Sequence, residues 1–179
     1  MKRAWIAAGL LCLTLAQPAS PAAAEMIVQT CFSPHGKCSA HILREIEMAK
    51  QELLVAVYAF TSADLAGAVV EAKRRGVAVQ VIVDREFDRA NDNSKSRYLE
   101  AQRVPVRRIS GSSAKMPDRD PGLMHQKFAV IDRRLVFTGS YNWTHSAESR
   151  NDENLLVFRN AGPLAEEYRK AFFRLWERK

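Results

Sequence analysis

Apolar residues group along the chain into runs of two kinds: some nearly continuous, others recurring every three or four positions. Nearly continuous runs predict buried strands, and recurring ones predict helices with one apolar stripe. Strands are expected at Ile27–Phe32, Glu52–Phe60, Val77–Val83, Val104–Ile109, Leu123–Ile131, Leu135–Thr138 and Asn154–Phe158. Helices are expected from Ser39 to Ala49, over Ala63–Arg75, around Arg97–Gln102 and over Pro163–Glu177.

The segment from Glu52 to Val83 has the order strand, helix, strand. Ser62 can cap its helix and Gly76 can end it. Two strands joined in this way are parallel, with a right-handed crossover. The short turn Asp132-Arg133-Arg134 instead predicts a hairpin. Together these features predict an α/β sandwich with a mixed, largely parallel sheet flanked by helices.

The first 24 residues have the pattern of a secretory signal. Lys2 and Arg3 precede an apolar run that is followed by Ala22-Ala23-Ala24, so we expect cleavage after Ala24. The apolar run is shorter than the roughly 20 residues that span a bilayer, although an uncleaved signal anchor remains the alternative. We therefore expect a single domain at residues 25–179. It would be periplasmic or secreted, without stable membrane insertion after cleavage.

Composition narrows the class of protein. The chain has 179 residues, of which 47% are hydrophobic and 26% charged, close to the average for globular proteins. Disordered, collagen-like and coiled-coil classes are therefore excluded. There are 27 Lys and Arg against 20 Asp and Glu, a formal charge of +7, which indicates anionic partners.

Cys31 and Cys38 are the two cysteines that remain after the expected cleavage. Thiols outside the cytoplasm tend to be oxidised, so a disulfide between them is the first interpretation. A metal site is the alternative, because Cys31, His35, Cys38 and His41 are ligand types that suit zinc. Their spacing does not match the common zinc-finger patterns. The third interpretation is that Cys31 and Cys38 are free thiols.

A candidate phosphate site lies on the two strands around the expected hairpin. His125 and Lys127 are two positions apart, so on a strand their side chains point to the same face. The imidazole can attack phosphorus or transfer a proton, and the ammonium group can neutralise phosphate oxygens. Ser140 and Asn142 have the same spacing and follow Gly139, which allows a close approach to a ligand. With Lys127, they are expected to bind the phosphate oxygens.

These residues resemble the signature of the phospholipase D superfamily, H-x-K-x4-D-x6-G-S-x-N. It is matched by His125, Lys127, Asp132, Gly139, Ser140 and Asn142. Tyr58–Ser62, Arg75–Asp84 and Asn151–Asn154 also resemble the small bacterial exported endonuclease branch. The resemblance implies that residues 25–179 form a phospholipase D-like catalytic domain. It also implies two-step phosphodiester hydrolysis without a metal or other cofactor, in which one His forms a phosphohistidine and a second protonates the leaving oxygen.

This scheme needs two copies of the motif, and the chain contains one. The resemblance therefore implies a homodimer with the active site across its two-fold axis. It also assigns Glu153 as the carboxylate that orients the His125 ring. Asp132, grouped with the catalytic residues, is expected to orient the site through hydrogen bonds without touching the substrate.

The loop Ser110–Gly122 precedes His125 and is the candidate substrate groove, with Lys115 and Arg119 as phosphate contacts. DNA is the expected substrate, with RNA as a further candidate, cut without sequence preference. A phospholipid phosphodiesterase with the same site is the alternative, against which stands the lack of an amphipathic membrane helix. A nucleic-acid-binding protein without activity is the third reading. It is disfavoured because a binder has no need for His125.

Overall fold

A computed structural model describes residues 24–112 and 122–178 of the protein. Its strands are β1 (Ile27–Ser33), β2 (Glu52–Val57), β3 (Ala78–Asp84), β4 (Val106–Ile109), β5 (Lys127–Ile131), β6 (Leu135–Gly139) and β7 (Glu153–Arg159). Its helices are α1 (Cys38–Met48), α2 (Ala63–Arg74), α3 (Arg85–Ala90), α4 (Ser96–Ala101), α5 (His145–Ser149) and α6 (Gly162–Trp176). The short helices α3 and α5 were not expected, since both lie in polar segments. Asp84 and Thr144 cap them.

The seven strands form one sheet in the order β1-β7-β6-β5-β2-β3-β4. The pairs β2–β3 and β3–β4 are parallel, as the strand-helix-strand pattern predicts. The pairs β1–β7, β7–β6, β6–β5 and β5–β2 are antiparallel. The mixed α/β sandwich is confirmed, but the expectation of a largely parallel sheet is wrong. The β5–β6 hairpin pairs directly with β2, and β1 returns beside the last strand.

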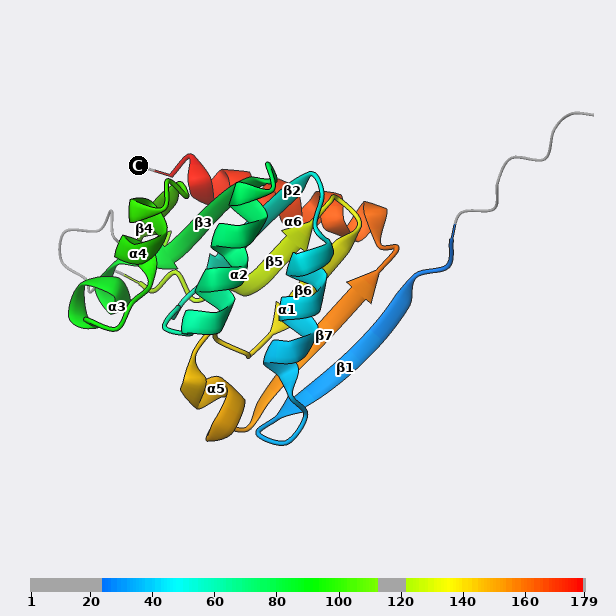
Figure 1. The fold of residues 1–179 in the computed structure, drawn as a ribbon, viewed down its shortest axis with the longest axis horizontal. Helices are drawn as coiled ribbons and strands as arrows, with labels where there is room; N and C mark the ends of the chain where they lie inside the picture. The colour runs from blue at the N-terminus through cyan, green and yellow to red at the C-terminus, as the bar shows by residue number, and fades with distance from the viewer. Residues whose placement is uncertain (1–23, 113–121, 179) are drawn as a thin grey trace, which may run out of the picture.

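Helices α1 and α2 cover one face of the sheet, and α6 covers the other (Figure 1). Because side chains alternate along a strand, β2 contributes to both cores. Leu53 and Val55 pack toward α1 and α2, while Leu54 and Ala56 pack toward α6. All residues of β2 are buried, as its continuous apolar sequence predicts.

Three strands, β2, β4 and β5, are shorter than expected, and the differences in β2 and β5 fall at the same edge of the sheet. β2 ends at Val57 and β5 starts at Lys127, and these two residues are paired. His125 therefore lies just before β5, beside the chain that leaves β2. The antiparallel neighbours β6 and β7 bring Gly139 and Glu153 to the same edge. The candidate residues meet there because of this strand order.

A disulfide joins Cys31 in β1 to Cys38 at the start of α1, as predicted. The two sulfurs are therefore bonded to each other, which removes the ligands that the alternative zinc site needs. Within residues 24–112 and 122–178, no group of three or more His, Cys, Asp or Glu side chains is arranged to hold a metal ion. Among those same residues, no helix has the length and apolar character needed to cross a membrane.

Candidate active site

His125 and Lys127 lie where the extended chain enters β5. Gln126 between them continues the pairing with β2, because its carbonyl oxygen accepts a hydrogen bond of 2.8 Å from the backbone N–H of Tyr58. The Lys127 ammonium group donates to the carbonyl oxygen of His125 at 3.0 Å. His125 is exposed and Lys127 is half-buried. The structure thus places a reachable imidazole next to an ammonium group.

Electrostatics favour the neutral form of His125. Partial burial and then the positive charge of Lys127 lower the pKa of His125 below its ordinary value of 6.5, while the charge of Asp84 opposes them. Burial lowers the pKa of Lys127 below 10.5, although the charges of Glu153 and Asp84 act to raise it. A neutral imidazole has the lone pair that a nucleophile needs.

Ser140 and Asn142 follow β6 and use their oxygens to hold neighbouring backbone. The Ser140 hydroxyl oxygen accepts from the backbone N–H of Asn154 at 3.0 Å. The Asn142 side-chain oxygen accepts from the backbone N–H of Ala59 at 3.3 Å. Because both oxygens act as acceptors, the hydroxyl proton and the amide NH2 group can be donated to phosphate oxygens. Both side chains therefore fit the predicted phosphate-binding role.

Gly139 has a φ of 147°, in the range that favours glycine. A Cβ at this position would collide with the carbonyl oxygen of Asn154. Sequence reasoning expected the glycine to allow approach to a ligand. In the structure it allows β6 to approach β7, which sets the Ser140–Asn154 contact.

Glu153 is the first residue of β7, and its carboxylate accepts from the Asn151 amide at 3.1 Å. Burial lowers the pKa of Lys127, and the charge of Glu153 opposes that shift. Among the described residues it makes no hydrogen bond to His125 within one chain. Within the described residues of one chain, Glu153 therefore acts on the site through its charge on Lys127. Its role in orienting the His125 ring stays a prediction.

Asp132 lies at the opposite end of β5 from His125, about 20 Å away at the rise of an extended strand. It is the first residue after β5 and has a φ of 50°, which Asp tolerates better than most residues. Its carboxylate accepts from the backbone N–H groups of Lys50, Gln51 and Glu52 at 2.7–3.2 Å. It therefore holds the start of β2, and the structure does not bring it together with the other motif residues.

Lys115 and Arg119 lie outside the described residues. The two glycines that flank this segment are in contact, since the backbone N–H of Gly111 donates to the carbonyl oxygen of Gly122. A Cβ on Gly111 would collide with the backbone of Gly122. The two ends of the segment therefore meet directly before His125.

Sequence reasoning missed two residues that surround His125. The half-buried Tyr58 ring lies 4.8 Å from the His125 ring and 5.2 Å from the Phe87 ring, measured between centroids. The Lys127 ammonium nitrogen lies 5.0 Å from the centroid of the Tyr58 ring.

Asp84 is the second missed residue. It is fully buried, and its carboxylate accepts from the backbone N–H of Met124 at 2.8 Å. The sequence signal that could have identified them is a polar residue at the end of a buried strand, Tyr58 after β2 and Asp84 in β3.

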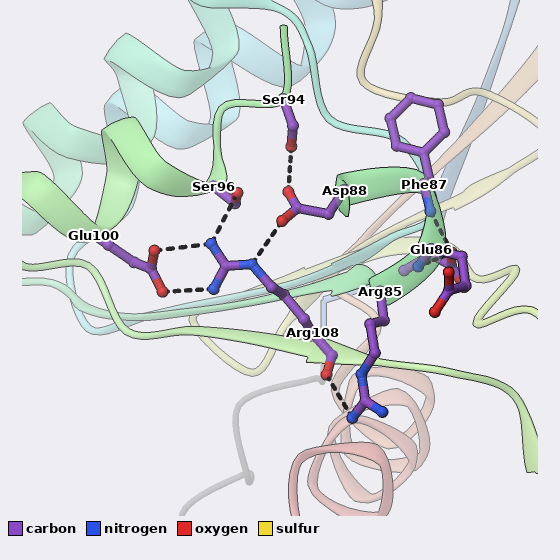
Figure 2. Close-up of polar contacts among 9 residues, drawn as sticks. Arg85, Glu86, Phe87, Asp88, Ser94, Ser96, Glu100 and Arg108 are labelled. Carbon is purple, nitrogen blue, oxygen red and sulfur yellow. Dashed lines mark hydrogen bonds and ion pairs between the residues drawn. The ribbon is translucent and has the colours of Figure 1, made fainter. Parts of the chain in front are cut away.

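An ion-pair network fixes α3, the helix that carries Phe87 (Figure 2). The Arg108 guanidinium bonds Asp88 at 2.6 Å and Glu100 at 2.7 and 2.8 Å. The hydrogen bonds to Glu100, and those to Asp88, raise the pKa of Arg108. Burial acts to raise the pKa of Asp88, but hydrogen bonds from Ser94, Ser96 and Arg108 outweigh it and lower that pKa. This charged cluster keeps α3 next to Tyr58.

Known proteins resemble this chain in sequence and in fold. Residues 42–176 match the family described as "Cardiolipin synthase, PLD-like domain". The chain is 32% identical over 141 residues to a protein named phospholipase D from Rickettsia felis, with 79% of this chain and 65% of the relative covered. The chain thus spans about two thirds of the length of that curated relative.

Two solved structures have this fold over nearly the whole length of their chains. Nuc from Salmonella typhimurium, described as a phospholipase D family member, has a TM-score of 0.75 and 32% identity, with 85% of this chain and 95% of that chain covered. NucT from Helicobacter pylori has a TM-score of 0.79 and 29% identity, with 86% and 97% covered.

Proposed function

The chain belongs to the phospholipase D superfamily, and on this premise we propose that it is a metal-independent phosphodiesterase, acting as a non-specific endonuclease on DNA. The observation that carries the proposal is the pairing of an exposed His125 with the Lys127 ammonium group, beside the donors of Ser140 and Asn142. These groups supply a nucleophile and three cationic or neutral donors for one phosphate.

The proposed reaction has two steps. The neutral imidazole of one His125 attacks phosphorus, a P–N bond forms, and the P–O bond to the leaving group breaks. A second, protonated His125 gives its proton to the leaving oxygen. That second imidazole then takes a proton from water, whose oxygen attacks phosphorus and breaks the P–N bond. Lys127, Ser140 and Asn142 neutralise or bind the oxygens that carry charge in both steps.

One chain contains one His125, so the second imidazole comes from a second copy of the chain. We expect a homodimer in which the two His125 residues face each other across a two-fold axis. The exposure of His125 at the edge of the sheet supports this arrangement. The two imidazoles would then titrate as a coupled pair that can share one proton.

DNA is favoured over phospholipid by the excess of Lys and Arg over Asp and Glu, which remains after Lys2 and Arg3 leave with the signal, and by the resemblance to the small bacterial endonuclease branch. RNA is a further candidate substrate of the same site. Hydrolysis of phospholipid is the second candidate function, favoured by the name phospholipase D of the relative from Rickettsia felis. Both reactions use the same residues, so the substrate decides between them.

Export is part of the proposal. The signal pattern in residues 1–24 and the Cys31–Cys38 disulfide support a periplasmic or secreted protein. Mass spectrometry of the protein purified from its own cell envelope or medium tests this expectation, which requires a chain that begins at Glu25.

The first experiment incubates the purified protein with plasmid DNA, with RNA and with phospholipid vesicles, each in excess EDTA. DNA cleavage that survives EDTA and is lost in His125→Ala supports the proposal. His145→Ala is the matched control, because His145 is also an exposed histidine and lies on α5; this variant is expected to retain activity. Hydrolysis of vesicles with DNA intact would assign the second candidate function, and cleavage abolished by EDTA would contradict the mechanism.

A second experiment tests the shared site. Wild-type and His125→Ala chains are refolded together at different ratios, and DNA cleavage is measured. A site made by two chains predicts activity that falls with the square of the wild-type fraction. A linear decrease would show that one chain carries a complete site.

A further inference from the structure

Asp84 is a buried carboxylate that lies behind the catalytic candidates. It is the last residue of β3, with no exposed surface. One carboxylate oxygen accepts from the backbone N–H groups of Glu86 and Phe87, at 3.0 and 2.9 Å. The other accepts from the backbone N–H of Met124 at 2.8 Å. Asp84 thus joins the start of α3 to the residue that precedes His125.

We propose that Asp84 is a positioning residue of the catalytic centre, which fixes the approach of the chain to His125 and holds the α3 segment against the same site. This inference rests on the proposed role of His125. The contact matters because Met124 directly precedes His125, and Asp84 bonds its backbone N–H to the end of β3. An error of about 1 Å in a catalytic group can cost on the order of a hundredfold in rate.

The chemistry of the contacts requires a carboxylate. All three partners of Asp84 are N–H donors, distributed over both oxygens. Asparagine of the same shape has one oxygen and one NH2 group, so one set of donors would face another donor. A buried N–H without an acceptor is costly, and the Met124 segment or the start of α3 would move.

Asp84 also acts by its charge on both catalytic side chains, His125 and Lys127. Burial and the charge of Lys127 lower the pKa of His125, and the charge of Asp84 opposes this shift. Burial lowers the pKa of Lys127, and the charges of Glu153 and Asp84 oppose that shift. Asp84 is therefore the carboxylate common to the two groups, and its charge offsets part of the repulsion between them.

A second connection runs through side chains. Asp84 caps the helix on which Phe87 lies, the Phe87 ring packs against Tyr58, and Tyr58 packs against His125. Loss of the cap would loosen this aromatic contact as well as the backbone contact at Met124. Both effects act on the same imidazole.

The test compares Asp84→Asn with Asp132→Asn. Asp132 is the matched comparison, because it too accepts from three backbone N–H groups but lies at the other end of the sheet. The His125 imidazole is titrated by NMR in each variant, with its signal assigned by its loss in His125→Gln, and kcat and KM for DNA are measured.

In Asp84→Asn we expect a His125 midpoint lower by about half a pH unit or more, because a negative charge near the imidazole is lost. We also expect kcat to fall on the order of ten- to a hundredfold, with KM nearly unchanged. Asp132→Asn should leave the His125 midpoint in place. A midpoint that does not move in folded Asp84→Asn, or an unchanged kcat, overturns the proposal.

Asp84→Glu decides the matter if Asp84→Asn does not fold. It keeps the charge and displaces the carboxylate by one methylene, so kcat should fall about tenfold while the His125 midpoint stays near that of wild type. A kcat within twofold of wild type would overturn the proposal. If the wild-type protein does not cleave DNA, the proposed substrate has failed, and the NMR titration still tests Asp84.

Discussion

The ammonium nitrogen of Lys127 lies 5.0 Å from the centroid of the Tyr58 ring, at the point where β2 ends. A cation over an aromatic face is attracted by about 0.5–2 kcal/mol, depending on its exposure. The same ring packs against the His125 ring in an edge-to-face arrangement. Tyr58 therefore restricts both side chains that the proposed mechanism uses.

Tyr58→Leu should lower kcat about tenfold, because the loss of the ring frees both Lys127 and His125. Tyr58→Phe keeps the ring and should stay within about threefold of wild type. Steady-state DNA cleavage by the two variants provides the measurement. Equal losses in both variants would assign the effect to the phenol hydroxyl and contradict a role of the ring.

Lys127→Met should raise the pKa of His125. Partial burial and the charge of Lys127 hold that pKa below 6.5, so removal of the neighbouring cation relieves one of the two causes. In wild type, the unfolded state binds more protons than the folded state as pH falls below 6.5. The stability that neutral His125 contributes is therefore lost as pH falls from 6.5 through its folded pKa. NMR titration of the imidazole measures the shift, and a lower pKa in Lys127→Met would contradict it.

Gly139→Ala should lower the free energy of unfolding by about 2 kcal/mol or more and reduce activity. The φ of 147° is strained for alanine, and its Cβ would push Asn154 away from Ser140. Gly67→Ala is the matched control, since Gly67 lies in α2 and its Cβ would meet nothing within 4 Å. The free energy of unfolding of that variant should rise by up to about 1 kcal/mol. Urea unfolding of both variants is the measurement, and equal stability would refute the collision.

Removal of the Cys31–Cys38 disulfide should lower the free energy of unfolding by about 2 kcal/mol, as expected for a loop closed by residues seven positions apart. The double variant Cys31→Ser, Cys38→Ser is compared with wild type in urea, with and without dithiothreitol. The reductant should destabilise wild type and leave the variant unaffected. Equal sensitivity of the two proteins would mean that the bond is absent in solution.

Sequence patterns were sufficient for the elements that depend on local signals. The βαβ unit of β2, α2 and β3 followed from a buried run, the Ser62 cap and the Gly76 stop. The direction of each strand relative to its neighbours was harder to predict, because pairing between strands distant in sequence depends on packing. The hairpin of β5 and β6 had no local feature to say that it would lie antiparallel beside β2.

The site shows the same division. The spacing of His125 and Lys127 was enough to bring them together, since period two is a property of an extended chain. Asp132 belongs to the same motif, yet its side chain holds the far end of β2. Asp84 was overlooked because its role depends on Met124, 40 positions later in the chain. Such contacts are set by tertiary structure and leave no spacing to recognise.

The hydrogen bond between Gly111 and Gly122 brings together the two ends of the segment that lies between them. Chain exchanged between these two glycines would enter and leave at the same place, whatever its length, so the cost of a longer insert is mainly the small entropy of loop closure. Met124 and His125 lie outside this segment and would keep their anchorage. Segments of other lengths could therefore be inserted between these two glycines, by protein engineering or by natural recombination, while the position of His125 is retained.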